Sequence, residues 1–448
     1  MEALTKAAVS ANGAKPRPIR GLPPGPRMSR ALQTAIWSRR AQWFLEQSRA
    51  RFGPMFSIKI AYEGDWVMIS DPELVKQVFT GDPKVFHAGE GNQILRTVLG
   101  DNSVLVLDEQ RHIEQRKLLL PPFHGERMQA YGEKMTEIAA REIESWPTGV
   151  PYKLRPRMQA ITLEIIIETV FGVHQGERMG ALREALRDFL DLTTNPRILL
   201  PVLLIGPSRI TRVPAFRRRV DPVNRLIAEE IAARRGAEDL AERDDVLSML
   251  VAARHEDGSP MSDAEIRDEL LTLLVAGHET TATALSWAME RLVRHPKKLE
   301  RLRAEVEEGE DAYLTATIQE TLRLRPVIVI VVRKLTEPVE LGGYELPAGA
   351  SVTPCIHLIH RDPQIYPDPE RFLPERFLDD PPGTYTWIPF GGGVRRCLGA
   401  AFAQFEMSVV LRELVRRHEI RPANPAPERS FRRAITETPR HDAEVVLG

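Results

Sequence analysis

One segment constrains the fold more than any other: residues from Ser262 to His295 have the periodicity of a single long helix. Ser262 and Glu265 have the spacing of a capping box at its start, and Pro296 ends it. About 34 residues at about 1.5 Å each give a helix about 51 Å long, enough to cross a whole domain. Its middle, residues 270–277, is largely apolar on every face, so we expect it to be buried. The rest of the chain has to pack around this helix.

Elements on either side of the long helix complete a mainly helical pattern. Helical periodicity covers Ser29–Ala50 and dominates in Glu109–Arg254, except in Asn195–Val220, which four prolines interrupt. Further helices are expected at Ala312–Leu324 and Ala401–Arg417. Alternating or β-branched runs predict short strands at Phe56–Ile60, Trp66–Ser70, Val327–Val332, Val339–Leu346 and Ser351–Cys355. The expected fold class is mainly α with a minor β-sheet subdomain made from both ends of the chain.

Composition limits the location and the partners. Residues 1–30 contain the proline-rich run Gly21–Pro26, so we expect a flexible leader followed by a single domain, 31–448. The 61 basic and 62 acidic residues give a net charge of −1, which offers no argument for a nucleic-acid partner. No run reaches the roughly 18 apolar residues of a transmembrane anchor. Two cysteines are too few for a disulfide framework. We therefore expect no transmembrane anchor and a cytoplasmic location.

The segment Phe390–Gly399, FGGGVRRCLG, carries the clearest chemical signal. Its glycine run lets the backbone turn tightly and pass close to a flat ligand. Cys397 precedes the last predicted helix, where unpaired N–H groups and the positive helix end favour a thiolate. Gly399 removes bulk just beyond the sulfur. A cysteine beside a glycine loop is by itself more often a core residue than a ligand. The fixed spacing of Phe, Gly, Arg, Cys and Gly makes a chance match rare.

These residues resemble the haem-binding loop of the cytochromes P-450, and the similarity extends from about residue 31 to the end of the chain. The resemblance implies haem b, iron protoporphyrin IX, with Cys397 as the axial ligand of the iron. It also implies that Phe390 packs near the sulfur, that Arg395 reaches a haem propionate and that Gly399 belongs to the same cofactor-binding loop. The expected fold is then the cytochrome P-450 fold, with the long helix passing over the haem.

A second motif, AGHETT, occupies residues 276–281 in the middle of the long helix. Ala276 and Thr280 lie four residues apart and share one face, and Thr280 can hydrogen-bond to a carbonyl of its own helix. An acid such as Glu279 inside an apolar helix is costly unless it has a task. Alone, the motif would more often be a contact between helices. The resemblance implies that Ala276 contacts the haem and that O₂ binds here, with Thr280 and Glu279 as the catalytic residues that deliver protons.

Two further groups follow from the same resemblance. Glu320 and Arg323 lie one helical turn apart, which by default indicates a surface ion pair. The family pattern adds Arg376 and places all three in a buried structural network behind the haem loop. The second group binds the haem propionates and consists of His112, Arg116 and Arg333. Many relatives have tryptophan where His112 stands.

Family topology also places four segments over the haem: the loop after Phe86, Asn195–Val220, the long helix and 326–332. Few fixed charges occur in them. We expect a medium-sized apolar substrate, because an apolar pocket gains about 25 cal/mol for each Å² of ligand surface removed from water. Arg96 is the main exception and could receive a carboxylate. The pocket residues expected from these segments, which might equally be core, are Ile94, Leu95, Val98, Val327 and Ile328.

Three functions remain open. The first is a monooxygenase that inserts one oxygen atom of O₂ into a C–H or C=C bond. Only 51 residues follow Cys397, so we expect electrons from a separate ferredoxin or flavodoxin with its reductase, docking at Arg111, Lys117 and Arg396. The second is a peroxygenase or a non-oxygenating isomerase or dehydratase; peroxygenases of this family tend to have arginine and proline at Glu279 and Thr280. The third is a haem sensor, which would not need the proton-delivery pair.

Overall fold

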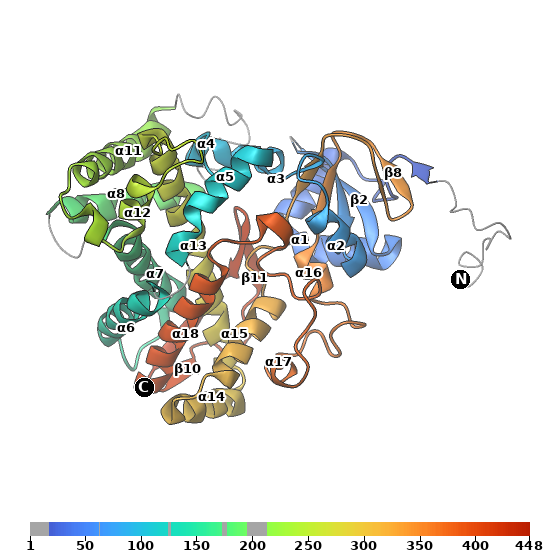
Figure 1. Cartoon of the computed structure of the whole chain (residues 1–448). Helices are drawn as coiled ribbons and strands as arrows, with labels where there is room; N and C mark the ends of the chain where they lie inside the picture. The colour runs from blue at the N-terminus through green and yellow to red at the C-terminus, as the bar shows by residue number, and fades with distance from the viewer. Residues whose placement is uncertain (1–17, 62, 124–126, 173–176, 195–212) are drawn as a thin grey trace.

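The computed structural model describes residues 18–61, 63–123, 127–172, 177–194 and 213–448. Helices fill most of it, and a smaller β-rich part lies on one side, as predicted (Figure 1). Most of Asn195–Val220 lies outside the described residues. The main helices are α1 (Arg30–Phe52), α2 (Pro72–Thr80), α5 (Glu109–Leu119), α6 (Arg127–Glu144), α7 (Leu154–Phe171), α8 (Glu177–Thr194), α11 (Pro214–Arg235), α12 (Val246–Ala252), α13 (Asp263–Val293), α14 (Pro296–Glu308), α15 (Ala312–Leu324) and α18 (Ala400–Arg417), with short turns α3 (Ala88–Gly91), α4 (Arg96–Leu99), α16 (Ile356–Ile359) and α17 (Arg376–Asp379).

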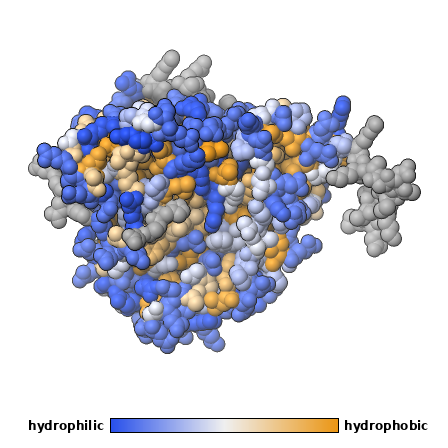
Figure 2. All heavy atoms as spheres, viewed as in Figure 1, coloured by the Kyte–Doolittle hydropathy of each residue, from blue (hydrophilic) through white to orange (hydrophobic). Residues whose placement is uncertain are grey.

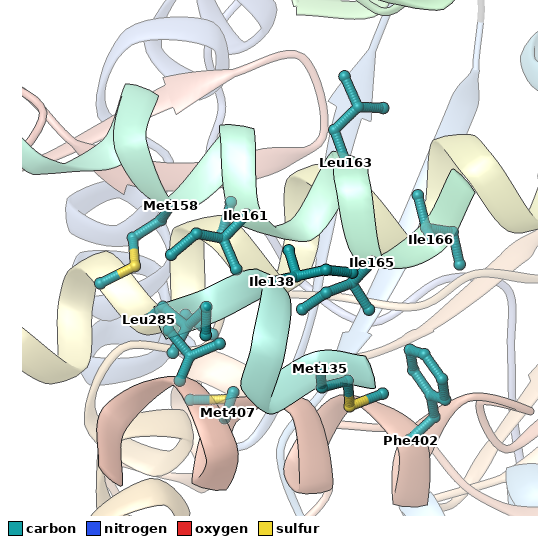
Figure 3. Close-up of a cluster of buried hydrophobic side chains, with 14 of the residues drawn as sticks. Met135, Ile138, Met158, Ile161, Leu163, Ile165, Ile166, Leu285, Phe402 and Met407 are labelled. Atoms are coloured by element: carbon teal, nitrogen blue, oxygen red, sulfur yellow. The ribbon is translucent and has the colours of Figure 1, made fainter. Parts of the chain in front are cut away.

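The predicted long helix is α13, with 31 residues. Its capping box forms as expected, with Ser262 N donating to Glu265 Oε2 at 2.8 Å and Glu265 N donating to Ser262 Oγ at 3.3 Å. The helix packs lengthwise on α7 and also contacts α11, α15 and α18. Buried side chains of α6, α7, α13 and α18 meet in one cluster (Figure 3), which includes Met135, Ile138, Met158, Ile161, Ile165, Leu285, Phe402 and Met407.

The strands come from both ends of the chain, as predicted. In the five-stranded sheet, ordered β2-β3-β9-β6-β4, β3 runs parallel to β9 and joins residues near 67 to residues near 352. Two three-stranded sheets, β1-β8-β7 and β10-β13-β5, and the hairpin β11-β12 complete the β structure of the described residues. The strands are β1 (Ile19–Arg20), β2 (Met55–Ile60), β3 (Gly64–Ile69), β4 (Phe86–His87), β5 (Tyr152–Lys153), β6 (Arg333–Leu335), β7 (Val339–Leu341), β8 (Tyr344–Leu346), β9 (Ser351–Pro354), β10 (Ile420–Pro422), β11 (Ser430–Arg433), β12 (Thr436–Pro439) and β13 (Glu444–Leu447).

The prediction of a strand at 327–332 is wrong. The segment is irregular, and β6 begins only at Arg333. The residues of the run pack into three different cores: Val327 joins the large helical cluster, Ile328 contacts the second, and Val329 belongs to the third. Because this packing already buries the β-branched side chains, a paired strand is not needed to remove them from water. β propensity describes that fit to a half-buried surface rather than a backbone preference.

Part of the predicted leader is integrated into the fold. Ile19–Arg20 forms β1, which pairs in parallel with β8. Ser57 N of β2 donates to Pro24 O at 3.0 Å. Gly25 approaches β2 so closely that a Cβ would lie 1.9 Å from Ser57 O, so a larger residue would force the two segments apart.

One face of the molecule carries both hydrophilic and hydrophobic side chains. The hydrophilic ones cover most of its margin, and the hydrophobic ones gather between them (Figure 2). Within the described ranges, no helix combines the length and the apolarity needed to cross a bilayer.

Candidate functional site

The loop before α18 is held by a hydrogen bond within its own backbone and by close packing against α2. Cys397 N donates to Phe390 O at 3.0 Å. Gly391 and Gly393 have φ angles of 67° and 64°, which lie in the left-handed region that glycine adopts most easily. A Cβ on Gly393 would lie 1.9 Å from Phe79 O of α2. The glycines are therefore required both by the turn and by close packing against α2.

The sulfur of Cys397 is accessible yet closely surrounded by protein. Its side chain is exposed, and a Cβ on Gly399 would meet no atom within 4 Å, so space remains open beside it. Desolvation raises the pKa of the Cys397 thiol, and the Gly399 N–H with Arg116 and Arg396 only partly opposes the rise. The Gly399 N–H at the start of α18 therefore acts in the predicted direction and favours the thiolate, against the effect of burial. A metal ion bonded to the sulfur would produce the thiolate, because coordination deprotonates a thiol. The loop fits such a group.

Four basic side chains predicted to bind propionates are brought together near this loop. Burial, together with the neighbouring cations of the group, lowers the pKa of His112 to about 3 and those of Arg333 and Arg395 to about 10. Burial also lowers the pKa of Arg116. The acid that contacts Arg395 is Asp108, at 2.6 Å. The excess of buried positive charge is unfavourable unless anions join it. The two carboxylates of a haem match this need.

The long helix opens where the second motif was predicted. Ala276 is exposed and Val275, Gly277 and Thr280 are partly exposed, although nearly all of α13 around them is buried. Thr280 Oγ1 donates to Ala276 O at 2.6 Å, the back-bond that the spacing predicted. This bond uses the hydroxyl proton and leaves the oxygen lone pairs as acceptors on the accessible side of the helix.

The carboxylate of Glu279 binds to α7 rather than to the Thr280 hydroxyl. It accepts hydrogen bonds from Arg155 Nη1 at 2.8 Å and from Gln159 Nε2 at 2.6 Å. Arg155 Nε also donates to Asp442 Oδ1 at 2.8 Å. Burial raises the pKa of Glu279, and Arg155 and Gln159 oppose the rise. Glu279 and Thr280 are therefore neighbours in the sequence whose side chains have different environments.

Sequence reasoning missed the polar face of α7 that holds this acid. Arg155, Gln159 and Thr162 are spaced by four and three residues and lie on one face of a mostly apolar helix. Thr162 Oγ1 lies 3.0 Å from His278 Nδ1, next to Glu279. Burial lowers the pKa of His278 to about 3, so its ring is neutral and packed. The polar spacing within an apolar helix was the available signal.

The structure brings the three residues of the predicted structural network together, with Glu320 and Arg323 fully buried and Arg376 partly buried. Arg323 Nε donates to Glu320 Oε2 at 2.6 Å, and Arg376 Nε lies 3.3 Å from the same oxygen. Glu320 and Arg323 are both 0% exposed. Arg323 also donates to His360 O at 2.7 Å, and His360 Nε2 accepts from Ile388 N at 2.9 Å. Ile388 is two residues before Phe390, so the network connects α15 to the cysteine loop.

The predicted pocket residues divide between accessible and buried positions. Ile94 is 38% exposed and Val327 is 7% exposed, while Leu95, Val98 and Ile328 are partly exposed. Arg96 Nε lies 3.4 Å from Asp101 Oδ1, so its charge has a partner within the chain.

One apolar segment beside this region was missed. Glu437 N of β12 donates to Val327 O at 2.9 Å and attaches the hairpin β11-β12 to the predicted pocket segment. Ile435, in the turn of that hairpin, is 52% exposed.

Comparison with known proteins agrees with this geometry. A family model described as Cytochrome P-450 matches residues 19–443. Cytochrome P-450 135B1 of Mycobacterium tuberculosis is 44% identical and covers 95% of this chain and 91% of its own; cytochrome P-450 135A1 of the same species is 39% identical over 95% of each. The structure of retinoic-acid-bound cyanobacterial CYP120A1 is similar at a TM-score of 0.83 and 26% identity, covering 97% of this chain and 100% of that one. The cysteine loop, the buried cation cluster and these matches together show that the chain belongs to the cytochrome P-450 family of haem enzymes.

Proposed function

We propose that the protein is a monooxygenase that inserts one oxygen atom of O₂ into a medium-sized apolar substrate, by hydroxylation or epoxidation. The observation that carries this reaction is the opening in α13, where the partly exposed hydroxyl residue Thr280 directly follows the buried acid Glu279 in the sequence. A peroxygenase, an isomerase or dehydratase, or a haem sensor has no need of such a pair. The catalytic domain would comprise residues 18–448, because β1 is part of its sheet structure.

In this proposal each group of residues has a separate role. Haem bound through Cys397 supplies the oxygen chemistry, and the thiolate favours O–O cleavage. Arg116, Arg333, Arg395 and His112 hold the haem carboxylates, while Phe390 and Gly399 shape the loop around the sulfur. Thr280 Oγ1 passes a proton at the accessible side of α13. Glu279 is the second group of the proposed proton path; burial raises its pKa, and the ion pair with Arg155 opposes the rise.

The substrate class rests on the lining and on one relative. The predicted pocket side chains are apolar. Arg96, the residue that could receive a substrate carboxylate, already pairs with Asp101 of this chain. The structurally similar CYP120A1 has retinoic acid bound, a largely apolar molecule that carries a carboxylate. That relative supports an apolar substrate, whereas the preference for a neutral one rests on the apolar lining and on the pairing of Arg96 with Asp101.

Electrons would come from a separate ferredoxin or flavodoxin. Arg111 of α5 and Arg396 of the cysteine loop are exposed, which suits an acidic partner. Lys117, the third predicted docking residue, is paired with Glu256 at 2.7 Å. Both side chains of that pair are largely exposed, so it costs little to break, and the proposed docking face keeps Arg111, Lys117 and Arg396. The predicted cytoplasmic location agrees with such partners.

The decisive test replaces the proposed iron ligand. Reduced protein with CO should show the strongly red-shifted Soret band of a thiolate-bound haem, and Cys397→Ala should lose it. Cys355→Ala is the matched control, because Cys355 is buried in the core and burial raises its pKa to about 12. A Cys397→Ala protein that keeps the band would contradict the assignment.

A further inference from the structure

A cluster of ionisable side chains surrounds His87, at the end of β4. His87 Nδ1 lies 3.1 Å from Glu90 Oε1 and 3.7 Å from Asp108 Oδ2, and Nε2 lies 3.1 Å from Glu109 Oε1. A neutral imidazole has one N–H, so its second nitrogen would present a lone pair to a carboxylate. With carboxylates at both nitrogens, the arrangement fits the doubly protonated, positively charged ring. The His87 side chain is only 11% exposed, so solvent screens this charge weakly.

Asp108 connects this cluster to the proposed haem site. Its Oδ1 accepts from Gly89 N at 2.7 Å and from Arg395 Nη2 at 2.6 Å, and its Oδ2 accepts from Glu90 N at 2.8 Å. It precedes α5, the helix that carries His112. One carboxylate thus joins the segment after β4, the start of α5 and the arginine of the cysteine loop.

The backbone beside Asp108 is strained. Glu109 has a φ of 51°, in the left-handed region that a glutamate seldom adopts. Its side chain contacts His87. From β6, Lys334 pairs with Glu90 at 3.9 Å and is the ladder partner of His87. The charges that face His87 are therefore three carboxylates, with Lys334 and Arg395 as the cations behind them.

We propose that His87 is a positioning residue for haem binding: as the cation among Glu90, Asp108 and Glu109, it fixes Asp108 and thereby the orientation of Arg395. This rests on the proposed contact of Arg395 with a haem propionate. Without the positive ring, the three carboxylates attract Arg395 more strongly. Arg395 then interacts less strongly with the haem propionate. The site also becomes more negative, which stabilises ferric over ferrous haem.

The experiment compares variants of His87 that differ in charge. His87→Gln should release haem to an apoprotein acceptor about fivefold faster, the upper end of what a partly exposed ion pair contributes. It should also lower the midpoint potential of the ferric/ferrous couple. His87→Lys, which restores a cation, should resemble the parent protein in both measurements. His255→Gln is the matched control, since His255 pairs with Glu265 at the start of α13, and should change neither.

Arg395→Gln in the same assay distinguishes the two levels of the proposal. If Arg395→Gln loses haem faster while His87→Gln does not, the role of His87 is wrong and the haem site stands. If His87→Lys is as impaired as His87→Gln, shape rather than charge matters, and the proposal is again wrong. If Arg395→Gln changes nothing, the propionate assignment fails and the inference with it.

Discussion

Neighbouring side chains in one motif have different surroundings here. Thr280 bonds along its own helix at an accessible position, whereas Glu279 is held by Arg155 and Gln159 of another helix. A helix turns about 100° per residue, so adjacent residues cannot share a face. For Glu279 to exchange a proton with Thr280, its bonds to α7 have to rearrange. The spacing of the motif identified the residues but not these partners.

Thr280→Ala should separate oxygen activation from product formation. The variant removes the hydroxyl and leaves the Ala276 carbonyl and the helix in place, so it should still bind haem and substrate. Electrons should be diverted to hydrogen peroxide, which is measured as peroxide and product formed per reduced nicotinamide consumed. Thr280→Ser keeps a hydroxyl and should retain most of the coupling. Unchanged coupling in Thr280→Ala would contradict the proposed role.

Packing between elements determines which predictions of regular structure succeed. α15 has the predicted bounds, Ala312–Leu324, because amphipathic periodicity and the following proline are local signals. The run at 327–332 has equally strong local signals for a strand and is irregular, because its side chains enter three cores. The Glu320 network could be predicted from family spacing, but its connection through His360 to Ile388 could not. That connection joins segments far apart in the chain.

Glu320→Ala should be much more harmful than removal of an exposed acid. It leaves Arg323, 0% exposed, without its carboxylate, and an unpaired buried charge typically costs about 3–5 kcal/mol. We expect a lower melting temperature and loss of haem, measured by thermal unfolding and by the ratio of Soret to protein absorbance. Glu229→Ala breaks an exposed pair with Arg225 and should cost at most about 1 kcal/mol. A fully loaded, equally stable Glu320→Ala protein would show that the network is dispensable.

The molecule as a whole places the site between its helical body and its β-rich part. Arg333 comes from β6, Arg395 from the cysteine loop and His112 from α5. The opening in α13 and the segment at Val327 belong to the helical side. Ile328 packs in a core that also contains strands. The site is therefore assembled from segments that are remote in sequence, and its shape depends on how these two parts pack.

Substrate charge can be tested by titration of the ferric protein with matched neutral, anionic and cationic ligands of similar size. We expect the neutral apolar ligand to give the tightest spin-state shift, because the predicted pocket removes apolar surface from water and has no unpaired charge to offer. The absorbance change measures the affinity of each ligand. Tight binding by a small, highly polar compound, with none by any apolar one, would contradict the proposed substrate class.

Local signals in the chain were enough to identify the family and the long helix and to select the cysteine loop and the other candidate residues, because caps, glycines and helical spacing act over a few residues. The partners of those residues were decided by tertiary packing. The α7 face that holds Glu279 and the histidine behind Asp108 both depend on contacts between separate segments of the chain. Burial and charge at such contacts are properties of the folded arrangement, so no local pattern encodes them.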